Sequence, residues 1–145
     1  MSGIYVVQGF SEEKLRNLAP RLAAQVGDGV SGLNHFGVNG ETLLGCVTGD
    51  HFKQGAMPRW VPAFGVWGIL TGALHECDTL SKCRAAHPDA GDDLGLLAAL
   101  AGAGRLEACL PTLNGAFFCA LWDPAAGKLT CFNDRFGLYP VYWSS

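Results

Sequence analysis

Two strand-like segments joined by a short turn, close to the C-terminus, restrict the possible folds of this chain more than any other feature. Residues 115–122 form a continuous apolar run. Residues 123–127 hold the Asp, Pro and Gly that favour a tight turn. Residues 128–133 then alternate between two sets of side chains, as a strand with two different faces does. The pattern predicts an antiparallel hairpin, and residues 140–143 predict one further strand.

The N-terminal part predicts a strand, a helix and a second hairpin. Residues 4–7 are β-branched and aromatic, which favours a strand. Ser11 stands where a helix N-cap would, and the leucines behind it recur at helical spacing, although Pro20 interrupts this face. The turn signal Asn39-Gly40 predicts a strand on each side. These strands are expected at residues 35–38 and 42–47.

The middle of the chain predicts a loop, a buried strand and a group of helices. Residues 49–62 contain Gly and Pro and are expected to form a loop. Residues 64–70 are apolar and predict a strand that ends in a turn at Thr71-Gly72. Asp92 or Asp93 stands where it would cap a helix. Helices are expected at residues 77–86, 94–103 and 106–110. The order of elements predicts an α+β fold with antiparallel sheets.

Composition limits the classes of function. The chain has 145 residues, which fits a single domain over 1–145, and 49% of them are hydrophobic, which excludes a disordered tail. The net charge is −3 and no run of Lys or Arg exists, so no nucleic-acid partner is expected. The apolar runs are shorter than the ~20 residues that a spanning helix needs, so no membrane contact is expected either. Because the N-terminus does not resemble a signal peptide, a cytoplasmic location is expected.

The six cysteines are expected to be reduced and buried. Their spacing is irregular and no Cys-x-x-Cys occurs. No pair of Cys or His residues has the spacing of a zinc finger, so no metal site is expected.

Four stretches together resemble the class II glutamine amidotransferases. Residues 113–123, Leu-Asn-Gly-Ala-Phe-Phe-Cys-Ala-Leu-Trp-Asp, are similar to that family's L-N-G-x-F-A-F-A-x-W-D. Residues 134–142 resemble its D-R-x-G-x-x-P-L-Y, and residues 91–97 stand where it has S-D-T-E-x-L-L. The opening Met-Ser-Gly-Ile resembles M-C-G-I. The most similar members are the N-terminal domains of asparagine synthetases and of related amide ligases, which include β-lactam synthetases and lasso-peptide cyclases.

The resemblance implies an α/β/β/α sandwich of the N-terminal-nucleophile type, with residues 4–7 in a central strand beside residues 115–122. It also implies that residue 2 becomes the N-terminus and the nucleophile after Met1 is removed. The α-amino group of residue 2 would act as the base, since such a group titrates near pH ~8. Attack on the glutamine amide would release ammonia, while backbone and side-chain donors hold the oxyanion.

Several of the positions that would carry this chemistry differ from the family pattern. Ser2 replaces the cysteine nucleophile, and its hydroxyl is far less acidic than a thiol. In the oxyanion segment Gly72 keeps its backbone N–H, whereas Thr71 replaces the asparagine donor. Ala73 replaces the glutamate that binds the substrate's α-amino group.

Only one member of the amino-acid clamp remains. Asp92 matches the aspartate of the family's amino-acid clamp, but the arginine that binds the substrate carboxylate is missing. Arg59 is the nearest alternative, and its position in the sequence does not match. Three further residues have a structural interpretation. Asp134 and Arg135 are expected to pair with each other near the sheet, and His75 is expected to be a surface or hydrogen-bonded residue and not a base.

The resemblance also implies partners outside this domain. The chain has no ATP-pyrophosphatase motif, so ATP and Mg²⁺ would belong to a separate synthetase domain, and no cofactor is expected in this chain. The sandwich is expected to be truncated at its C-terminal end, which favours self-association. A synthetase domain or subunit and glutamine or a related amide are the expected partners.

Three functions remain open at this point. The first is a degenerate glutaminase domain that serves as the scaffold of an asparagine-synthetase-like ligase. The second is a working N-terminal-serine amidohydrolase that releases ammonia from glutamine or another amide. The third is a non-catalytic module that docks a separate synthetase.

Overall fold

The computed structural model describes residues 3–26, 33–48 and 57–139. Within them the helices and strands follow the predicted order. The strands are β1 (Gly3–Gln8), β2 (Leu33–Asn39), β3 (Thr42–Thr48), β4 (Arg59–Val61), β5 (Val66–His75), β6 (Asn114–Asp123) and β7 (Lys128–Asn133). The helices are α1 (Glu12–Val26), α2 (Asp78–Ala86), α3 (Asp93–Gly102) and α4 (Leu106–Cys109), with 3₁₀ turns at Pro88–Ala90 and Leu110–Thr112.

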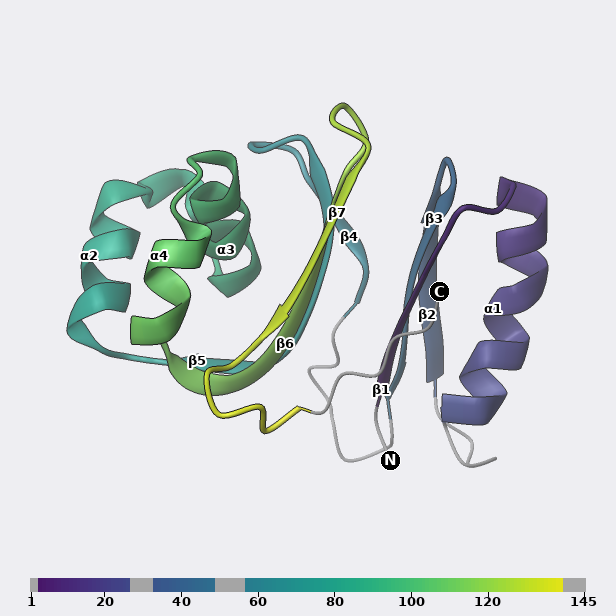
Figure 1. Cartoon of the computed structure of the whole chain (residues 1–145), viewed down its shortest axis with the longest axis horizontal. Coiled ribbons are helices and arrows are strands. Elements are labelled where there is room, and N and C mark those ends of the chain that lie inside the picture. The colour runs from purple at the N-terminus through teal and green to yellow at the C-terminus, as the bar shows by residue number, and fades with distance from the viewer. Residues whose placement is uncertain (1–2, 27–32, 49–56, 140–145) are drawn as a thin grey trace.

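The strands form two stacked sheets between two layers of helices (Figure 1). Sheet A has the order β1-β3-β2 and sheet B the order β4-β5-β6-β7. Every pairing is antiparallel. Helix α1 covers the outer face of sheet A, and α2, α3 and α4 cover the outer face of sheet B (Figure 1). The predicted α+β fold with antiparallel sheets is therefore confirmed.

Helix α1 lies on sheet A through one apolar face. Leu15 and Ala19 of the helix are fully buried against sheet A. Pro20 falls within the helix but is exposed, and the helix continues through it to Val26. A proline inside a helix costs about 3 kcal/mol, and burial of the opposite face offsets this cost. The sequence-based expectation that Pro20 interrupts the helix is therefore wrong.

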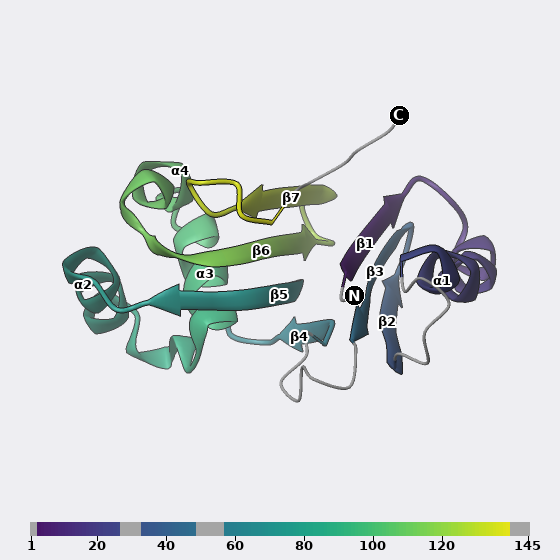
Figure 2. The same cartoon turned by 90° about the horizontal axis from the view of Figure 1, so that it is seen from below.

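The two sheets pack face to face through side chains that alternate along the strands. In β3, Leu44 and Cys46 face sheet B, whereas Leu43 and Val47 face α1. This period of two is the one that a strand buried on both faces requires. Figure 2 shows the two sheets side by side, with the strands of sheet A inclined to those of sheet B. The buried residues of this inter-sheet cluster are Leu44, Cys46, Ile69, Ala120 and Trp122.

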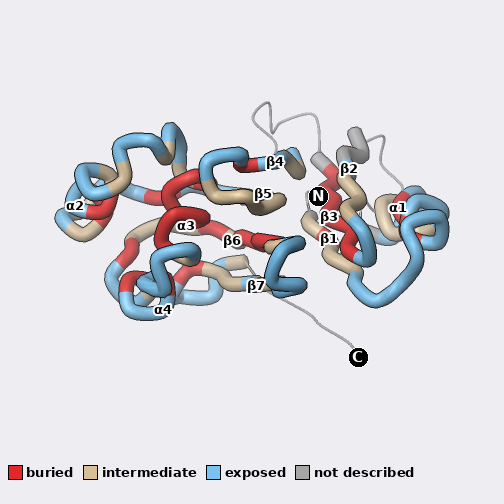
Figure 3. Tube along the Cα trace, turned by 90° about the horizontal axis from the view of Figure 1, so that it is seen from above, coloured by how far each residue is buried: buried red, intermediate tan, exposed pale blue. Residues whose placement is uncertain are grey.

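The largest core lies between sheet B and its helices. Helix α3 is the centre of this core, because residues 94–100 are all buried (Figure 3). Phe117, Cys119 and Leu121 of β6 point into it from the sheet. A helix that is apolar all round fits a position covered by a sheet on one side and by two other helices on the other.

The resemblance led us to expect the N-terminal strand beside residues 115–122, and this expectation is wrong. Strand β1 pairs with β3, and β6 pairs with β5 and β7 in the other sheet. Ile4 and Val6 contact the inter-sheet cluster, so β1 approaches β6 across the stacked faces and not along a ladder. Among the described strands, β1 is also at an edge of sheet A and not central. The expected strand at residues 140–143 lies outside the described residues.

Three local predictions are also corrected. The first hairpin turns at Gly40 and Glu41, one residue later than predicted, because Asn39 still pairs with Thr42. Part of the expected loop 49–62 forms β4, whose three residues pair with Val66–Gly68. Strand β5 does not end at Thr71-Gly72 but continues to His75.

Candidate functional site

The segment expected to hold an oxyanion lies in the last third of β5. Thr71 pairs with Phe118, Gly72 with Phe117 and Ala73 with Ala116. Since Phe118 packs on the inter-sheet cluster, its cross-strand neighbour Thr71 lies on the same face. Ala73, two residues on, shares that face. Thr71 is half-buried, whereas Gly72 and Ala73 are exposed.

Gly72 has a backbone conformation that only glycine adopts easily. Its φ is +85°, although it lies inside a strand. A Cβ at this position would lie 1.9 Å from the carbonyl oxygen of Ala116. The close approach of β6 therefore requires glycine here, and this requirement explains why β5 continues through a residue that usually marks a turn.

Asp92 begins helix α3 and carries two interactions. Its carboxylate accepts a hydrogen bond from the backbone N–H of Gly95 at 2.9 Å, which caps the helix. The same carboxylate pairs with the Arg59 guanidinium, and the Nη2–Oδ1 distance is 2.6 Å. Both side chains are partly open to solvent, at 42% for Arg59 and 60% for Asp92. The predicted helix cap is confirmed, and the carboxylate already has a cation as its partner.

Arg59 and Asp92 lie on the helix side of sheet B. Arg59 pairs with Gly68 in the β4–β5 ladder. A Cβ on Gly68 would meet Leu94 of α3 at 2.8 Å, so this face of the ladder points toward the helices. Thr71 and Ala73 occupy the opposite, inter-sheet face of the same sheet. The structure thus places Asp92 beside β4, on the face of sheet B opposite to Thr71 and Ala73.

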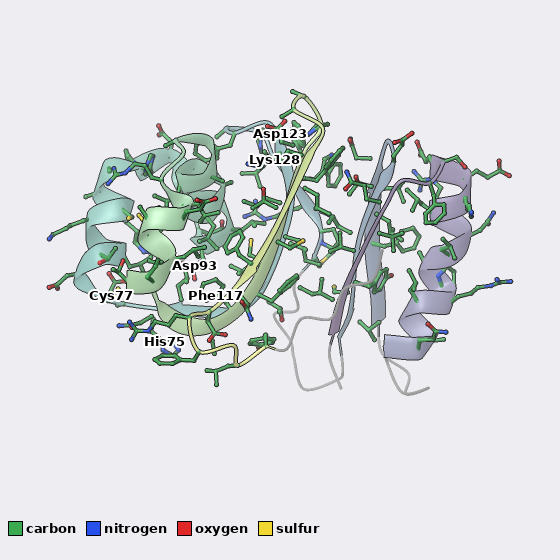
Figure 4. All side chains as sticks on the ribbon, in the orientation of Figure 1. His75, Cys77, Asp93, Phe117, Asp123 and Lys128 are labelled. Carbon is green, nitrogen blue, oxygen red and sulfur yellow. The ribbon has the colours of Figure 1, made fainter. Side chains whose placement is uncertain are left out.

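Asp93 connects the start of α3 to the end of β5, and sequence reasoning considered it only as an alternative cap. Its Oδ2 accepts a hydrogen bond from the backbone N–H of Leu74 at 3.3 Å. Its Oδ1 accepts one from Arg84 of α2 at 2.5 Å. Arg84 also lies 3.8 Å from the Glu76 carboxylate. Figure 4 shows Asp93 beside the end of β5 that carries His75. His75 is exposed, as expected.

Asp134 organises the turn after β7. It is 3% exposed, and its carboxylate accepts hydrogen bonds from the backbone N–H groups of Phe117, Phe136 and Leu138 at 3.4, 3.0 and 3.3 Å. Burial alone would raise the pKa of Asp134, but these backbone donors and that of Tyr139 lower it below its ordinary value.

Arg135 does not pair with Asp134, so the expected structural pair is wrong. The Arg135 guanidinium donates to the carbonyl oxygen of Pro111 at 3.3 Å and lies over the Phe136 ring. Phe136 and Leu138 are exposed at 68% and 62%. Backbone amides, which are always present, satisfy the buried Asp134 carboxylate without a side-chain cation.

The part of the chain that the structure describes contains no cluster of three or more His, Cys, Asp or Glu side chains that could hold a metal ion. No helix among these residues is long and apolar enough to cross a membrane. The six cysteines all lie in this part and are not disulfide-bonded. Four of them are buried as expected, but Cys77 is half-buried and Cys131 is exposed.

Comparison with known families decides the classification. A family model described as a glutamine amidotransferase domain matches residues 63–145, which is more than half of the chain. The chain belongs to this family. Comparison with curated proteins gives no match.

The matched segment covers strands β5, β6 and β7 of sheet B and helices α2, α3 and α4. It begins before β5 and includes Thr71, Gly72, Ala73 and Asp92. Ser2, the residue expected at the nucleophile position, precedes the matched segment and lies outside the described residues.

Proposed function

We propose that this glutamine amidotransferase domain is degenerate in glutamine hydrolysis and serves as the scaffold of an asparagine-synthetase-like amide ligase. Its partner would be a synthetase domain or subunit, which would supply ATP and Mg²⁺ chemistry. The proposal combines the N-terminal-nucleophile fold implied by the resemblance with the altered residues of the site.

The observation that carries this proposal is the ion pair between Asp92 and Arg59. Free glutamine is a zwitterion, and its ammonium group would need a carboxylate with no competing cation. Asp92 is the remaining clamp carboxylate, and Arg59 holds it at 2.6 Å. An incoming ammonium group would have to displace a guanidinium that is tethered to the adjacent strand.

The changes at positions 73 and 2 also weaken glutamine hydrolysis. Ala73 is exposed on β5 and offers a methyl group where the family has a carboxylate. Each charged hydrogen bond lost from the clamp reduces binding by about 1.5–3 kcal/mol, so glutamine affinity falls by orders of magnitude. Ser2 would further slow the chemical step, because its hydroxyl ionises far less readily than a thiol.

Gly72 favours the second candidate, a working N-terminal-serine amidohydrolase. Its φ is +85° and a Cβ would have no room beside Ala116, so this position requires glycine. A backbone N–H held in this way is the kind of donor that an oxyanion hole uses. Such an enzyme would act on an amide that lacks a free α-ammonium group, because the clamp for that group is incomplete.

Titration calorimetry with L-glutamine tests the degenerate clamp separately from the chemistry. We expect no binding by the unmodified protein at millimolar ligand. Substituting Arg59→Met should raise affinity roughly tenfold, because the Asp92 carboxylate loses its competing cation. Arg21→Met, which removes an exposed arginine of α1, is the matched control and should leave binding unchanged. Tight binding by the unmodified protein would contradict the proposal.

A further inference from the structure

Strand β7 forms one edge of sheet B. Among the described strands it pairs with β6 alone, and Figure 2 shows it at the outer side of the sheet. Its sequence includes one charged side chain, Lys128, and no proline. Charged residues and prolines are the usual protection of a sheet edge against further pairing. Most of β7 lacks this protection.

The opposite edge of sheet B is protected. Strand β4 has three residues, one of which is Arg59, and it lies between Pro58 and Pro62. A proline has no N–H group, so neither flanking residue can donate a hydrogen bond to another strand. Further pairing along sheet B is therefore favoured at β7 and not at β4.

The backbone groups of alternate residues in β7 point away from β6. The N–H of Asp134 donates to the carbonyl oxygen of Phe117 at 2.9 Å, in register with the β6–β7 ladder. Hydrogen-bonded and non-hydrogen-bonded pairs alternate along an antiparallel ladder, so every second residue of β7 bonds to β6 and the others do not. The residues whose N–H and C=O groups point outward are Leu129, Cys131 and Asn133.

These outward groups have the spacing that pairing with a second copy of the same strand requires. A two-fold axis at Cys131 would place Leu129 of each copy opposite Asn133 of the other. Each outward N–H would then meet an outward C=O, as in an antiparallel ladder. The strand is already held on both faces, since Leu129 packs on the inter-sheet cluster and Phe132 on the core beneath the helices. Pairing would therefore need no rearrangement of β7.

Two exposed apolar side chains lie next to this edge. Phe136 and Leu138 follow β7 and are 68% and 62% exposed. The buried Asp134 carboxylate accepts hydrogen bonds from the backbone N–H groups of both residues and so holds them in place. In the two-fold register, the turn at residues 124–127 of the second copy would lie alongside residues 135–138. This turn has the sequence Pro-Ala-Ala-Gly, so both copies would bury apolar surface.

We propose that two copies of this chain associate through β7 and form one continuous antiparallel sheet. The described strands would run β4-β5-β6-β7 in one copy and continue as β7-β6-β5-β4 in the other. Such an interface is isologous, because the same strand contributes from both copies. An edge of six residues buries little surface, so the association should be weak. This inference does not depend on the proposed function.

Sedimentation equilibrium of the whole chain tests the association. The mean mass should rise from that of one chain toward that of two as the concentration is raised to about 1 mM. Cys131→Lys should keep the protein monomeric, because two ammonium groups would face each other across the two-fold axis. Ala85→Lys adds the same charge at an exposed position of α2 and should associate as the unmodified protein does. A constant monomer mass for the unmodified protein, or equal association of the two variants, would overturn the proposal.

Disulfide trapping tests the register. Among the six cysteines, Cys131 is the exposed one. The Cα atoms of a hydrogen-bonded pair are about 5.5 Å apart, which a disulfide can span. Mild oxidation with copper phenanthroline should therefore link two copies of tryptic peptide 129–135, in which Cys131 is the sole thiol.

A matched variant separates this register from chance collision. Cys131→Ser combined with Ala85→Cys moves the exposed thiol from β7 to α2, and this protein should give no cross-linked dimer under the same conditions. Equal yields of dimer from the two proteins, or a dimer of the unmodified protein linked through another cysteine, would contradict pairing at β7.

Discussion

The indole Nε1 of Trp122 donates a hydrogen bond to the side-chain oxygen of Asn39 over 3.1 Å. The two residues are 83 positions apart and belong to different sheets, Trp122 to β6 and Asn39 to β2. Trp122 is buried in the inter-sheet cluster, so this bond satisfies the polar atom of an otherwise apolar side chain.

Replacing Trp122 by Phe should lower the free energy of unfolding by roughly 1–3 kcal/mol. The change removes the bond to Asn39 and part of the buried ring. Trp60→Phe is the matched control, because Trp60 is 40% exposed and lies outside this cluster. Urea denaturation of both variants gives the comparison. Equal losses would mean that the link between the sheets contributes nothing.

Gly72→Ala should destabilise the protein by at least about 2 kcal/mol. The positive φ alone costs about 1–3 kcal/mol for alanine, and the new methyl group would clash with Ala116. Gly102→Ala, near the end of α3, has open space around the Cβ and should be neutral or stabilising. Thermal melts measure the two changes, and similar midpoints would contradict the strain assigned to Gly72.

Asp134→Asn should lower stability at neutral pH by about 1–3 kcal/mol, since the carboxylate that three backbone N–H groups share would be lost. Because folding lowers the pKa of Asp134, its stabilising effect is full above the unfolded-state pKa. The effect disappears as the pH falls through the folded-state value.

The difference between the unmodified protein and Asp134→Asn should therefore shrink as urea denaturation is repeated from neutral to acidic pH. Asp89→Asn removes an exposed carboxylate and should change little at either pH. A difference that stayed constant down to acidic pH would show that the charge of Asp134 is not what stabilises the turn.

Local patterns predicted the elements whose signals are themselves local. The β6–β7 hairpin follows from an apolar run, a turn and an alternating return strand. The helix at α3 follows from an aspartate cap before a long apolar segment, and Asp92 does cap it. Both depend on residues close together in the chain, which a sequence displays directly.

Features that depend on distant partners were missed. Strand β4 has only three residues between Pro58 and Pro62, and it forms because β5 offers an edge. A glycine after an apolar run often marks a turn, yet the close approach of Ala116 requires Gly72 inside β5. The ion pair between Arg59 and Asp92 could not be predicted either, because the two residues are 33 positions apart and no spacing rule connects them.

Ammonia release from L-glutamine tests the central claim most directly. A coupled assay is run on the unmodified protein, on Ser2→Cys and on Ser2→Cys combined with Arg59→Met. We predict negligible release by the first two, because restoring the thiol does not restore the clamp, and measurable release only by the combined variant. Turnover by the unmodified protein or by Ser2→Cys alone at a rate typical of enzymes, about 1–10³ per second, would contradict the account.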